Sequence, residues 1–372
     1  MLICVSVVGI ALLAAGCPRE ERRTAPTTSG EEQPFVDPSG GPGGDPPGLS
    51  KGKELFSQKS FTAALSEFDE YVQMNPEDSR GHYYRSICLQ ALDRNDEAVK
   101  ALEKAVERQP DFPEKHNNLA GLYMMQNDFE GGIRVLETAI KAFPADGSLW
   151  YNLGLARLYN NRAASAAQAL DKAAGSGATT PGVWLAAGIA YLKAGSPVDA
   201  LNRFLKVLEG GNVNAGAEEG AAKALLALKR PKEALKHAEK AAALSPQNPA
   251  RLYLLGVAHL AAGNHDSALE ALDKAAERSP KNSTIQMRRA EVLFLSGKHK
   301  NALKMIKTAL SLVQEERDEL RGEMQLLLGE IQAAMKNCRS ALKAFDNARN
   351  LVGGNPELLE RLEKAVGRCR KK

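Results

Sequence analysis

Two stretches of the chain decide its fold: residues 150–157 read W-Y-N-L-G-L-A-R, and residues 184–191 read W-L-A-A-G-I-A-Y. Trp150 and Trp184 are the two tryptophans of the protein, and they stand 34 residues apart. A fixed interval of this size is the sequence signature of a repeat architecture. The interval therefore predicts further copies of the same unit along the 372 residues.

The interval continues without a slip through eight units. With the tryptophans at position four, the units begin at residues 45, 79, 113, 147, 181, 215, 249 and 283. Position eight then holds a small residue in every unit: Gly52, Ser86, Ala120, Gly154, Gly188, Ala222, Gly256 and Ala290. Position twenty-four holds a bulky residue except at Ala238. Small residues let two helices approach closely, and the bulky residue fills the gap beside them.

Prolines mark where each unit ends. Position thirty-two is proline in five units: Pro76, Pro110, Pro144, Pro246 and Pro280. Proline lacks the amide hydrogen and clashes with the preceding turn, so it ends a helix. Abundant alanine and leucine, with only 5% aromatic residues, favour helices over sheet. The pattern predicts two helices per unit and an all-α chain.

This pattern resembles the tetratricopeptide repeat, whose W-x₂-L-G-x₂-Y, A-x₃-F and P signature is matched most fully by Trp184, Gly188, Tyr191, Ala200 and Phe204. The resemblance implies a right-handed α-solenoid of about nine helix-turn-helix repeats over residues 49–355. A ninth unit opens at Gly322, five residues later than the period requires, so its first helix is expected to be longer by about a turn. Residues 356–372 are expected to form an amphipathic capping helix.

The sixth unit departs from the pattern. It follows Gly210 and Gly211, and it has Glu218 where other units place a large side chain and Ala238 where they place the bulky one. A glycine inside a helix costs roughly 0.5–1 kcal/mol relative to alanine, and a missing bulky residue removes buried surface. The sequence therefore predicts that this unit opens locally more easily than its neighbours, and we call it a soft joint.

The N-terminus has the features of an exported, lipid-anchored protein. Residues 2–16 are uncharged and apolar but fall short of the roughly 20 residues of a membrane-spanning helix, so residues 1–16 are interpreted as a signal peptide. Ala14, Ala15 and Gly16 before Cys17 resemble the bacterial lipobox, which implies that Cys17 is acylated and becomes the mature N-terminus. Ala14 replaces the commoner leucine, and residues 1–4 lack Lys and Arg, a lack that fits a start codon further upstream. The alternative is a buried apolar helix with a chance cysteine.

Residues 17–48 are rich in Pro, Gly, Ser and Thr and are expected to form a disordered tether. An apolar N-terminal segment followed by such a tether fits a protein that is anchored in the bacterial cell envelope and faces the periplasm. Pro18 stands where aspartate is associated with retention in the inner membrane, which favours the outer membrane.

Composition and motifs give no support for nucleic-acid binding, catalysis or metal binding. A net charge of +4 gives no electrostatic case for nucleic-acid binding. There is no phosphate-binding loop, nucleophile elbow or H-E-x-x-H motif, and no CxxC pair. His82 and His116 share position four and are interpreted as structural. We therefore expect no catalytic residue, cofactor or metal ligand. The question whether Cys338 and Cys369 pair stays open.

In the repeat family the first helices build a concave wall, with positions two, five, nine and twelve facing the groove. Here the wall is mainly aliphatic with tyrosines, and it lacks the Lys, Asn and Arg set with which the chaperone-binding subclass clamps a terminal carboxylate. Such a wall suits an extended or helical apolar segment. The residues predicted to contact that partner are Tyr83, Asn117, Tyr151, Tyr253 and Met287. About half of the wall is alternatively expected to pack against neighbouring helices.

These features predict a non-enzymatic, membrane-anchored scaffold that binds a peptide or helix of another protein within an assembly, secretion or cell-wall complex. The oligomeric state is not indicated. An alternative is an accessory subunit that recruits or regulates an envelope enzyme or polysaccharide machinery. An enzyme would require an acid, a base and a nucleophile that converge in one pocket.

Overall fold

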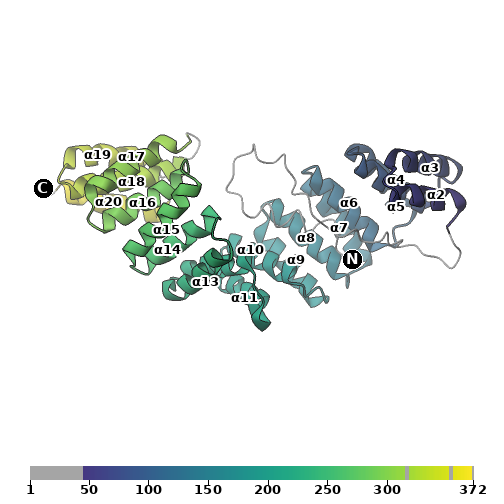
Figure 1. Ribbon diagram of the computed structural model, residues 1–372, viewed down its shortest axis with the longest axis horizontal. Coiled ribbons are helices and arrows are strands. Elements are labelled where there is room, and N and C mark those ends of the chain that lie inside the picture. Colours follow the sequence, from purple (N-terminus) through teal and green to yellow (C-terminus); the bar gives the residue numbers. More distant parts are fainter. Residues whose placement is uncertain (1–44, 315–317, 352–354, 371–372) are drawn as a thin grey trace. The chain divides into compact units, whose positions relative to one another are not determined.

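The computed structural model describes residues 45–314, 318–351 and 355–370. Cys17, the predicted signal peptide and most of the predicted tether lie outside these ranges. Every regular element in the described ranges is a helix (Figure 1). The chain divides into two compact units, residues 1–207 and residues 208–372. The sequence predicts one array over residues 49–355, and the division falls just before the sixth repeat.

The first unit consists of helical hairpins. Its helices are α2 (Pro47–Ser57), α3 (Phe61–Met74), α4 (Ser79–Ala91), α5 (Asn95–Arg108), α6 (Pro113–Met125), α7 (Phe129–Ala142), α8 (Gly147–Tyr159), α9 (Ala163–Gly175), α10 (Pro181–Lys193) and α11 (Pro197–Leu208). Each even-numbered helix here is the first helix of a repeat. The first of them, α2, is shorter than the others because it begins at Pro47.

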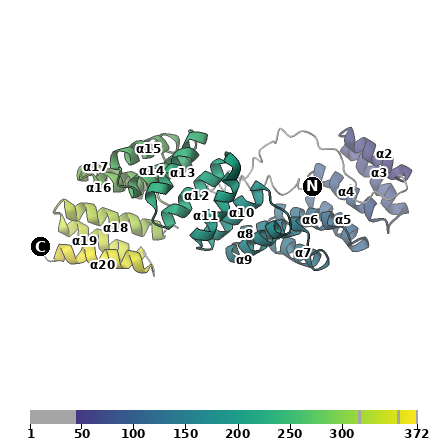
Figure 2. The same ribbon diagram turned by 90° about the horizontal axis from the view of Figure 1, so that it is seen from below.

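The second unit continues the same alternation (Figure 2). It holds a 3₁₀ turn, η2 (Glu209–Gly211), and then α12 (Ala215–Ala227), α13 (Pro231–Leu244), α14 (Pro249–Ala261), α15 (His265–Arg278), α16 (Ser283–Leu295), α17 (His299–Leu312), α18 (Asp318–Ala334), α19 (Cys338–Leu351) and α20 (Pro356–Arg370). Helix α18 has 17 residues where α16 has 13, as expected from the five extra residues. The predicted all-α fold of helix-turn-helix repeats with a C-terminal capping helix is confirmed.

The contact between the two helices of a hairpin is the one that the small and bulky positions predict. A Cβ atom added to Gly154 would lie 2.5 Å from Cγ of Leu170, and one added to Gly188 would lie 2.6 Å from Cε1 of Phe204. Such distances are below ordinary van der Waals contact, so only glycine fits at these points. The side chains of Leu170 and Phe204 are fully buried.

A hydrogen bond links position four of a repeat to the proline that ends the repeat before it. Trp150 Nε1 donates to the carbonyl oxygen of Pro144 at 2.8 Å. The same link recurs with other donors: His82 Nε2 to Pro76 O at 2.9 Å, His116 Nε2 to Pro110 O at 2.9 Å, and Gln286 Nε2 to Pro280 O at 3.1 Å. In these four repeats position four carries a side-chain N–H donor, which explains both buried histidines.

The turn between the two helices has the same backbone conformation in all nine repeats. Its second residue, at position fifteen, has a positive φ between 58° and 81° at Lys59, Asp93, Asn127, Asn161, Gly195, Lys229, Gly263, Gly297 and Lys336. This left-handed conformation is free of steric cost only for glycine. Three repeats therefore carry a lysine at a point where it is strained.

Glu218 in the sixth repeat is buried yet paired. Its Oε2 lies 2.5 Å from His237 Nδ1, and its Oε1 lies 3.5 Å from Lys240 Nζ, both on α13. A buried carboxylate needs such partners to offset its lost hydration. The repeat thus replaces an apolar contact within its hairpin by a polar one.

Candidate partner-binding face

The first-helix face is formed by the side chains at positions five, six, nine and twelve of each repeat's first helix. These positions lie within about 120° of one another around an α-helix, so they share one side. Most residues at position twelve are partly exposed, including Leu192, Leu226 and Leu260. This face is the surface that the sequence proposes for a partner.

The five predicted contact residues are unevenly exposed. Tyr83, Tyr151 and Met287 are 9%, 6% and 3% exposed, so they pack mainly against neighbouring helices. Asn117 and Tyr253 are partly exposed. Three of the five predicted contact residues therefore follow the alternative expectation, in which wall residues pack against neighbouring helices. Surface that a partner can reach lies at Asn117, at Tyr253 and at position twelve.

A ladder of neutral polar side chains joins successive first helices in the first unit. Asn118 Nδ2 donates to the hydroxyl of Tyr83 at 3.2 Å, which connects α6 to α4. Asn152 Nδ2 donates to Oδ1 of Asn117 at 2.7 Å, which connects α8 to α6. Each bond runs from position six of one repeat to position five of the repeat before it. Sequence reasoning considered positions two, five, nine and twelve and missed position six.

Asn117 is the central residue of this ladder. Its Oδ1 accepts the bond from Asn152, and its Nδ2 donates to Oγ of Ser148 at 2.8 Å. A primary amide has two N–H donors and two acceptor lone pairs. Within the described ranges, one donor and one lone pair of Asn117 are therefore left for a partner.

In the second unit the first-helix face carries charges. Arg251 Nε lies 3.2 Å from Oε2 of Glu219, and Arg288 Nη1 lies 2.6 Å from Oε2 of Glu291. Arg288 also donates through Nε to the hydroxyl of Tyr253 at 3.4 Å. The prediction of a mainly aliphatic wall omitted Arg288, which occupies position six. It also omitted Arg251, which occupies position three, outside the four positions of the face, and pairs with Glu219 on it.

Two pKa shifts follow from this charge pattern. Burial alone would lower the pKa of Arg288, but Glu291 and Tyr253 raise it above its ordinary value. Burial raises the pKa of Glu323 on α18; Glu319 and Glu291 raise it further, while Arg288 opposes the shift. Arg288 is therefore a fixed cation in the middle of an acidic region.

A pocket of about 610 Å³ lies at the C-terminal end of the same unit. Its wall includes Phe294 and Ala333, which occupy position twelve of the last two repeats, and Arg361 on α20. Arg361 donates to Glu330 through Nε at 2.8 Å. Cys338 and Cys369 also border the pocket, and no disulfide joins them in the described ranges. Burial raises the pKa of the Cys88 thiol to about 12, so Cys88 is not a reactive nucleophile.

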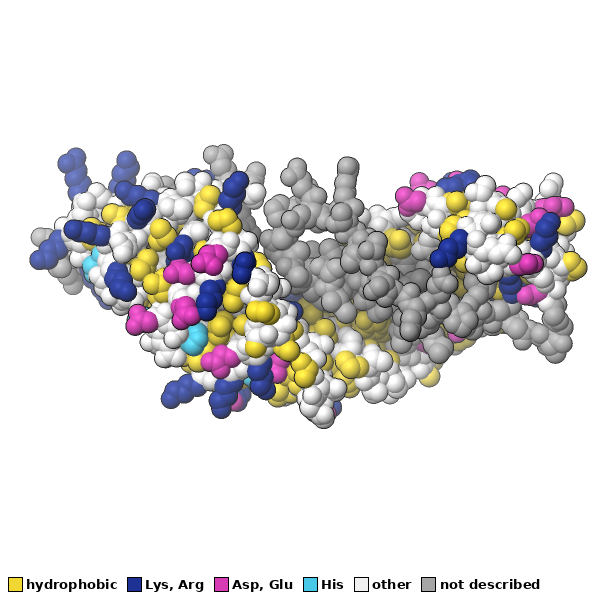
Figure 3. Space-filling view, in the orientation of Figure 1, with side chains coloured by type: hydrophobic (Ala, Val, Ile, Leu, Met, Phe, Trp, Pro, Cys, Tyr) yellow, Lys and Arg dark blue, Asp and Glu magenta, His cyan; other side chains and the backbone are white. Residues whose placement is uncertain are grey.

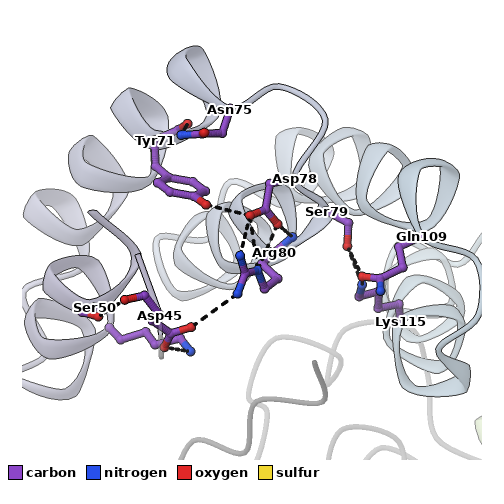
Figure 4. Close-up of polar contacts among 10 residues, drawn as sticks. Asp45, Ser50, Tyr71, Asn75, Asp78, Ser79, Arg80, Gln109 and Lys115 are labelled. Carbon is purple, nitrogen blue, oxygen red and sulfur yellow. Dashed lines mark hydrogen bonds and ion pairs between the residues drawn. The ribbon is translucent and has the colours of Figure 1, made fainter. Parts of the chain in front are cut away.

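A second polar cluster joins the first three repeats (Figure 4). Asp78 caps α4 by accepting from the Arg80 amide at 2.9 Å, and it accepts from the Tyr71 hydroxyl at 2.6 Å. Although burial opposes the shift, hydrogen bonds from Arg80 and Tyr71 lower the pKa of Asp78 to about 2. Nearby, the buried Lys115 donates to Gln109 Oε1 at 2.8 Å. These contacts join α3, α4, α5 and α6, so the cluster is structural.

The described ranges contain no group of three or more His, Cys, Asp or Glu residues arranged to hold a metal ion. Among the same residues, no helix is both long enough and apolar enough to cross a membrane. Neither finding bears on residues 1–44.

Two models of the tetratricopeptide repeat match the chain, one at residues 55–117, 225–292 and 259–322, and the other at residues 117–181 and 185–249. Together these matches cover well over half of the sequence. The chain belongs to the tetratricopeptide repeat family. Proteins of this family bind other proteins, and membership supports a role as a scaffold for protein–protein interaction.

Curated relatives match only part of this tetratricopeptide repeat protein. The Hsp70-Hsp90 organizing protein of Triticum aestivum is 25% identical over 99 residues, which are 27% of this chain and 17% of that protein. The Hsp70-Hsp90 organising protein of Plasmodium falciparum is 34% identical over 73 residues, 20% of this chain and 13% of that protein. The match thus spans less than a fifth of either relative.

Solved structures show likeness of fold alone. A tetratricopeptide repeat protein from Parabacteroides merdae has a TM-score of 0.55 and 16% identity, covering 69% of this chain and 98% of that one. A chain of the anaphase-promoting complex hetero-tetramer Cut9–Hcn1 has a TM-score of 0.53 and 11% identity, covering 86% of this chain and 75% of that one.

Proposed function

We propose that this protein is a non-enzymatic, lipid-anchored scaffold of the bacterial envelope that binds a peptide segment of another protein along its first-helix face. The observation that carries the proposal is the neutral polar ladder on α4, α6 and α8. A peptide backbone offers one N–H and one C=O per residue, and Asn117 has one acceptor and one donor left to meet them.

Partly exposed apolar residues beside this ladder support the same proposal. Met124 and Leu192 occupy position twelve on α6 and α10, and both are partly exposed. Apolar pockets between polar anchors are the usual arrangement for an extended or helical peptide. The partner segment is therefore expected to present alternating apolar side chains and a free backbone to the first unit.

A photo-crosslinking amino acid in the native envelope tests the binding face. It is placed at Leu192, on the first-helix face, and in a matched control at Leu205, which is 39% exposed on α11. We expect a discrete crosslinked partner from Leu192, absent from Leu205 and weakened by Asn117→Ala. Equal crosslinking from both sites contradicts the proposal. Tyr83 and Tyr151 are unsuited to this test because their truncation would leave cavities.

The anchor is tested separately. Mass spectrometry of the mature protein should find Cys17 as the first residue, carrying acyl chains. A mature chain that begins elsewhere and carries no lipid contradicts the proposed lipid anchor. That result would not contradict the proposed binding face.

A further inference from the structure

The outer side of α17 carries an uninterrupted stripe of lysines. Lys300, Lys304 and Lys307 are spaced i, i+4 and i+7, so they lie along one side of the helix, and all three are exposed. The opposite side is the buried one, formed by Ala302, Ile306 and Ala309, each 0% exposed. The lysines therefore point away from the body of the second unit.

The second helix of the next repeat carries basic residues at matching positions. Arg339 and Lys343 of α19 occupy positions eighteen and twenty-two, as Lys300 and Lys304 do on α17, and Lys298 lies in the turn before α17. The basic patch is defined as Lys298, Lys300, Lys304, Lys307, Arg339 and Lys343. None of the six forms an ion pair with any residue of the described ranges. Figure 3 shows Lys and Arg side chains gathered over α17 to α20.

Other repeats show that the fold does not demand these charges. The same three positions on α15 are Asp266, Glu270 and Asp273. Residues 208–372 contain 28 Lys and Arg against 20 Asp and Glu, a net charge of +8, whereas residues 1–207 contain 21 against 25, a net charge of −4. Positive charge is therefore concentrated in the second unit, and on α17 it faces solvent. Unpaired like charges repel one another, so their clustering indicates an anionic partner.

The neighbourhood of the patch identifies the kind of partner. Leu295 is 52% exposed and Met335 is 37% exposed, and they stand at the turns that precede α17 and α19. Apolar side chains beside lysines suit the interface of a bilayer, which takes up both. Five of the six patch residues are lysine and none is aromatic, whereas nucleic-acid surfaces favour arginine forks and stacking rings.

We propose that the basic patch is a docking surface for a membrane rich in anionic phospholipid. This inference goes beyond the proposed binding face and depends on neither that face nor the lipid on Cys17. Each lysine close to an anionic bilayer strengthens binding about fivefold, and added salt weakens the attraction. Exchanging two patch lysines for glutamate should therefore weaken vesicle binding by more than tenfold.

Vesicle sedimentation with the full chain tests the proposal. The chain carries Cys17→Ala so that no acyl chain contributes, and the vesicles are phosphatidylglycerol mixed with phosphatidylcholine, or phosphatidylcholine alone. The test variant is Lys300→Glu/Lys304→Glu. The matched control is Lys100→Glu/Lys104→Glu, an exposed lysine pair of the same spacing on α5. All four lysines are exposed, and circular dichroism verifies that both variants keep their helices.

We expect binding to the anionic vesicles that falls with salt, falls more than tenfold in the test variant, and changes less than twofold in the control. Three results overturn the proposal: unchanged binding in the test variant, an equal loss in the control, or tighter binding to double-stranded DNA of arbitrary sequence than to anionic vesicles. The last result would assign the patch to nucleic acid.

Discussion

Trp150 Nε1 donates a 2.8 Å hydrogen bond to the carbonyl oxygen of Pro144, and this bond joins the first helix of one repeat to the end of the repeat before it. The tryptophans that reveal the period are thus parts of the framework. Trp150 also lies beneath the ammonium group of Lys172, whose Nζ is 4.3 Å from the ring centroid. Both contacts hold the indole ring in place.

The first prediction concerns His116, which makes the same bond to Pro110. His116→Leu leaves the carbonyl oxygen of Pro110 without its donor, so we expect the free energy of unfolding to fall by about 1–3 kcal/mol. His116→Gln should lose much less, because Gln286 makes this bond in the eighth repeat. Urea unfolding followed by circular dichroism measures both variants. Equal losses would show that the hydrogen bond contributes little.

The second prediction concerns the close contact at Gly154. Gly154→Leu would press against Leu170, so we expect a loss of about 1–3 kcal/mol in the free energy of unfolding. Gly175→Ala on the adjacent α9 is the control, because a Cβ added there meets nothing within 4 Å. An unchanged melting temperature for Gly154→Leu would refute the assigned helix contact.

The third prediction concerns the strained turn at Lys229, where φ is 58°. A left-handed conformation costs an ordinary residue about 1–2 kcal/mol, and glycine adds about 0.4–1 kcal/mol of chain entropy to the unfolded state. Lys229→Gly should therefore raise the free energy of unfolding by about 0.5–1 kcal/mol. The reciprocal exchange, Gly263→Lys at the same position of the next repeat, should lower it. Melting temperatures that shift in the same direction in both variants would contradict this prediction.

The fourth prediction concerns pH and Asp78. Its pKa is lowered from 3.8 to about 2 in the folded protein, so the carboxylate stabilises the fold above about pH 4, and this contribution is lost as pH falls toward 2. Asp78→Asn keeps a capping side chain, as Asn248 caps α14, but removes the charge. We expect the melting temperature of the variant to be lower than that of the wild type at pH 7 and equal to it near pH 2. A difference that does not change with pH would refute the role of the charge.

The fifth prediction concerns the sixth repeat. Its hairpin, α12 and α13, has Ala238 in place of a bulky residue, and Glu218 replaces an apolar contact by a polar one. Fewer buried apolar contacts lower the free energy of local opening. Hydrogen exchange should therefore be faster in α12 and α13 than in α8 and α9. Equal protection in the two hairpins would rule out a soft joint.

The periodic small and bulky residues were sufficient to predict the fold. Gly154 and Gly188 meet Leu170 and Phe204 as expected, because a contact that recurs every 34 residues leaves a statistical trace in one sequence. Position fifteen left a weaker trace, because Gly, Asn or Asp stands there in six of the nine repeats and lysine stands there in the other three. Lys229 and Gly263 share one backbone conformation there, and a lysine gives no sequence signal for a left-handed turn.

The candidate face was harder to predict than the fold. Position five was identified, but the burial of Tyr83 and Tyr151 depends on the side chains of the next repeat. Asn152 and Arg288 were missed because each lies at position six and bonds across to position five of the preceding repeat. Comparing position five of each repeat with position six of the next would have paired these residues.

The bond between position four and the preceding proline also bears on how such a chain can change in length. Where it forms, the spacing from the proline to the donor is always six residues, so an inserted residue would pull donor and acceptor apart. The five extra residues of this protein precede the ninth repeat, and Gln325 at its position four makes no such bond within the described ranges. Growth or loss in this family of sequences is therefore expected in whole units, with irregular insertions confined to junctions that lack this link.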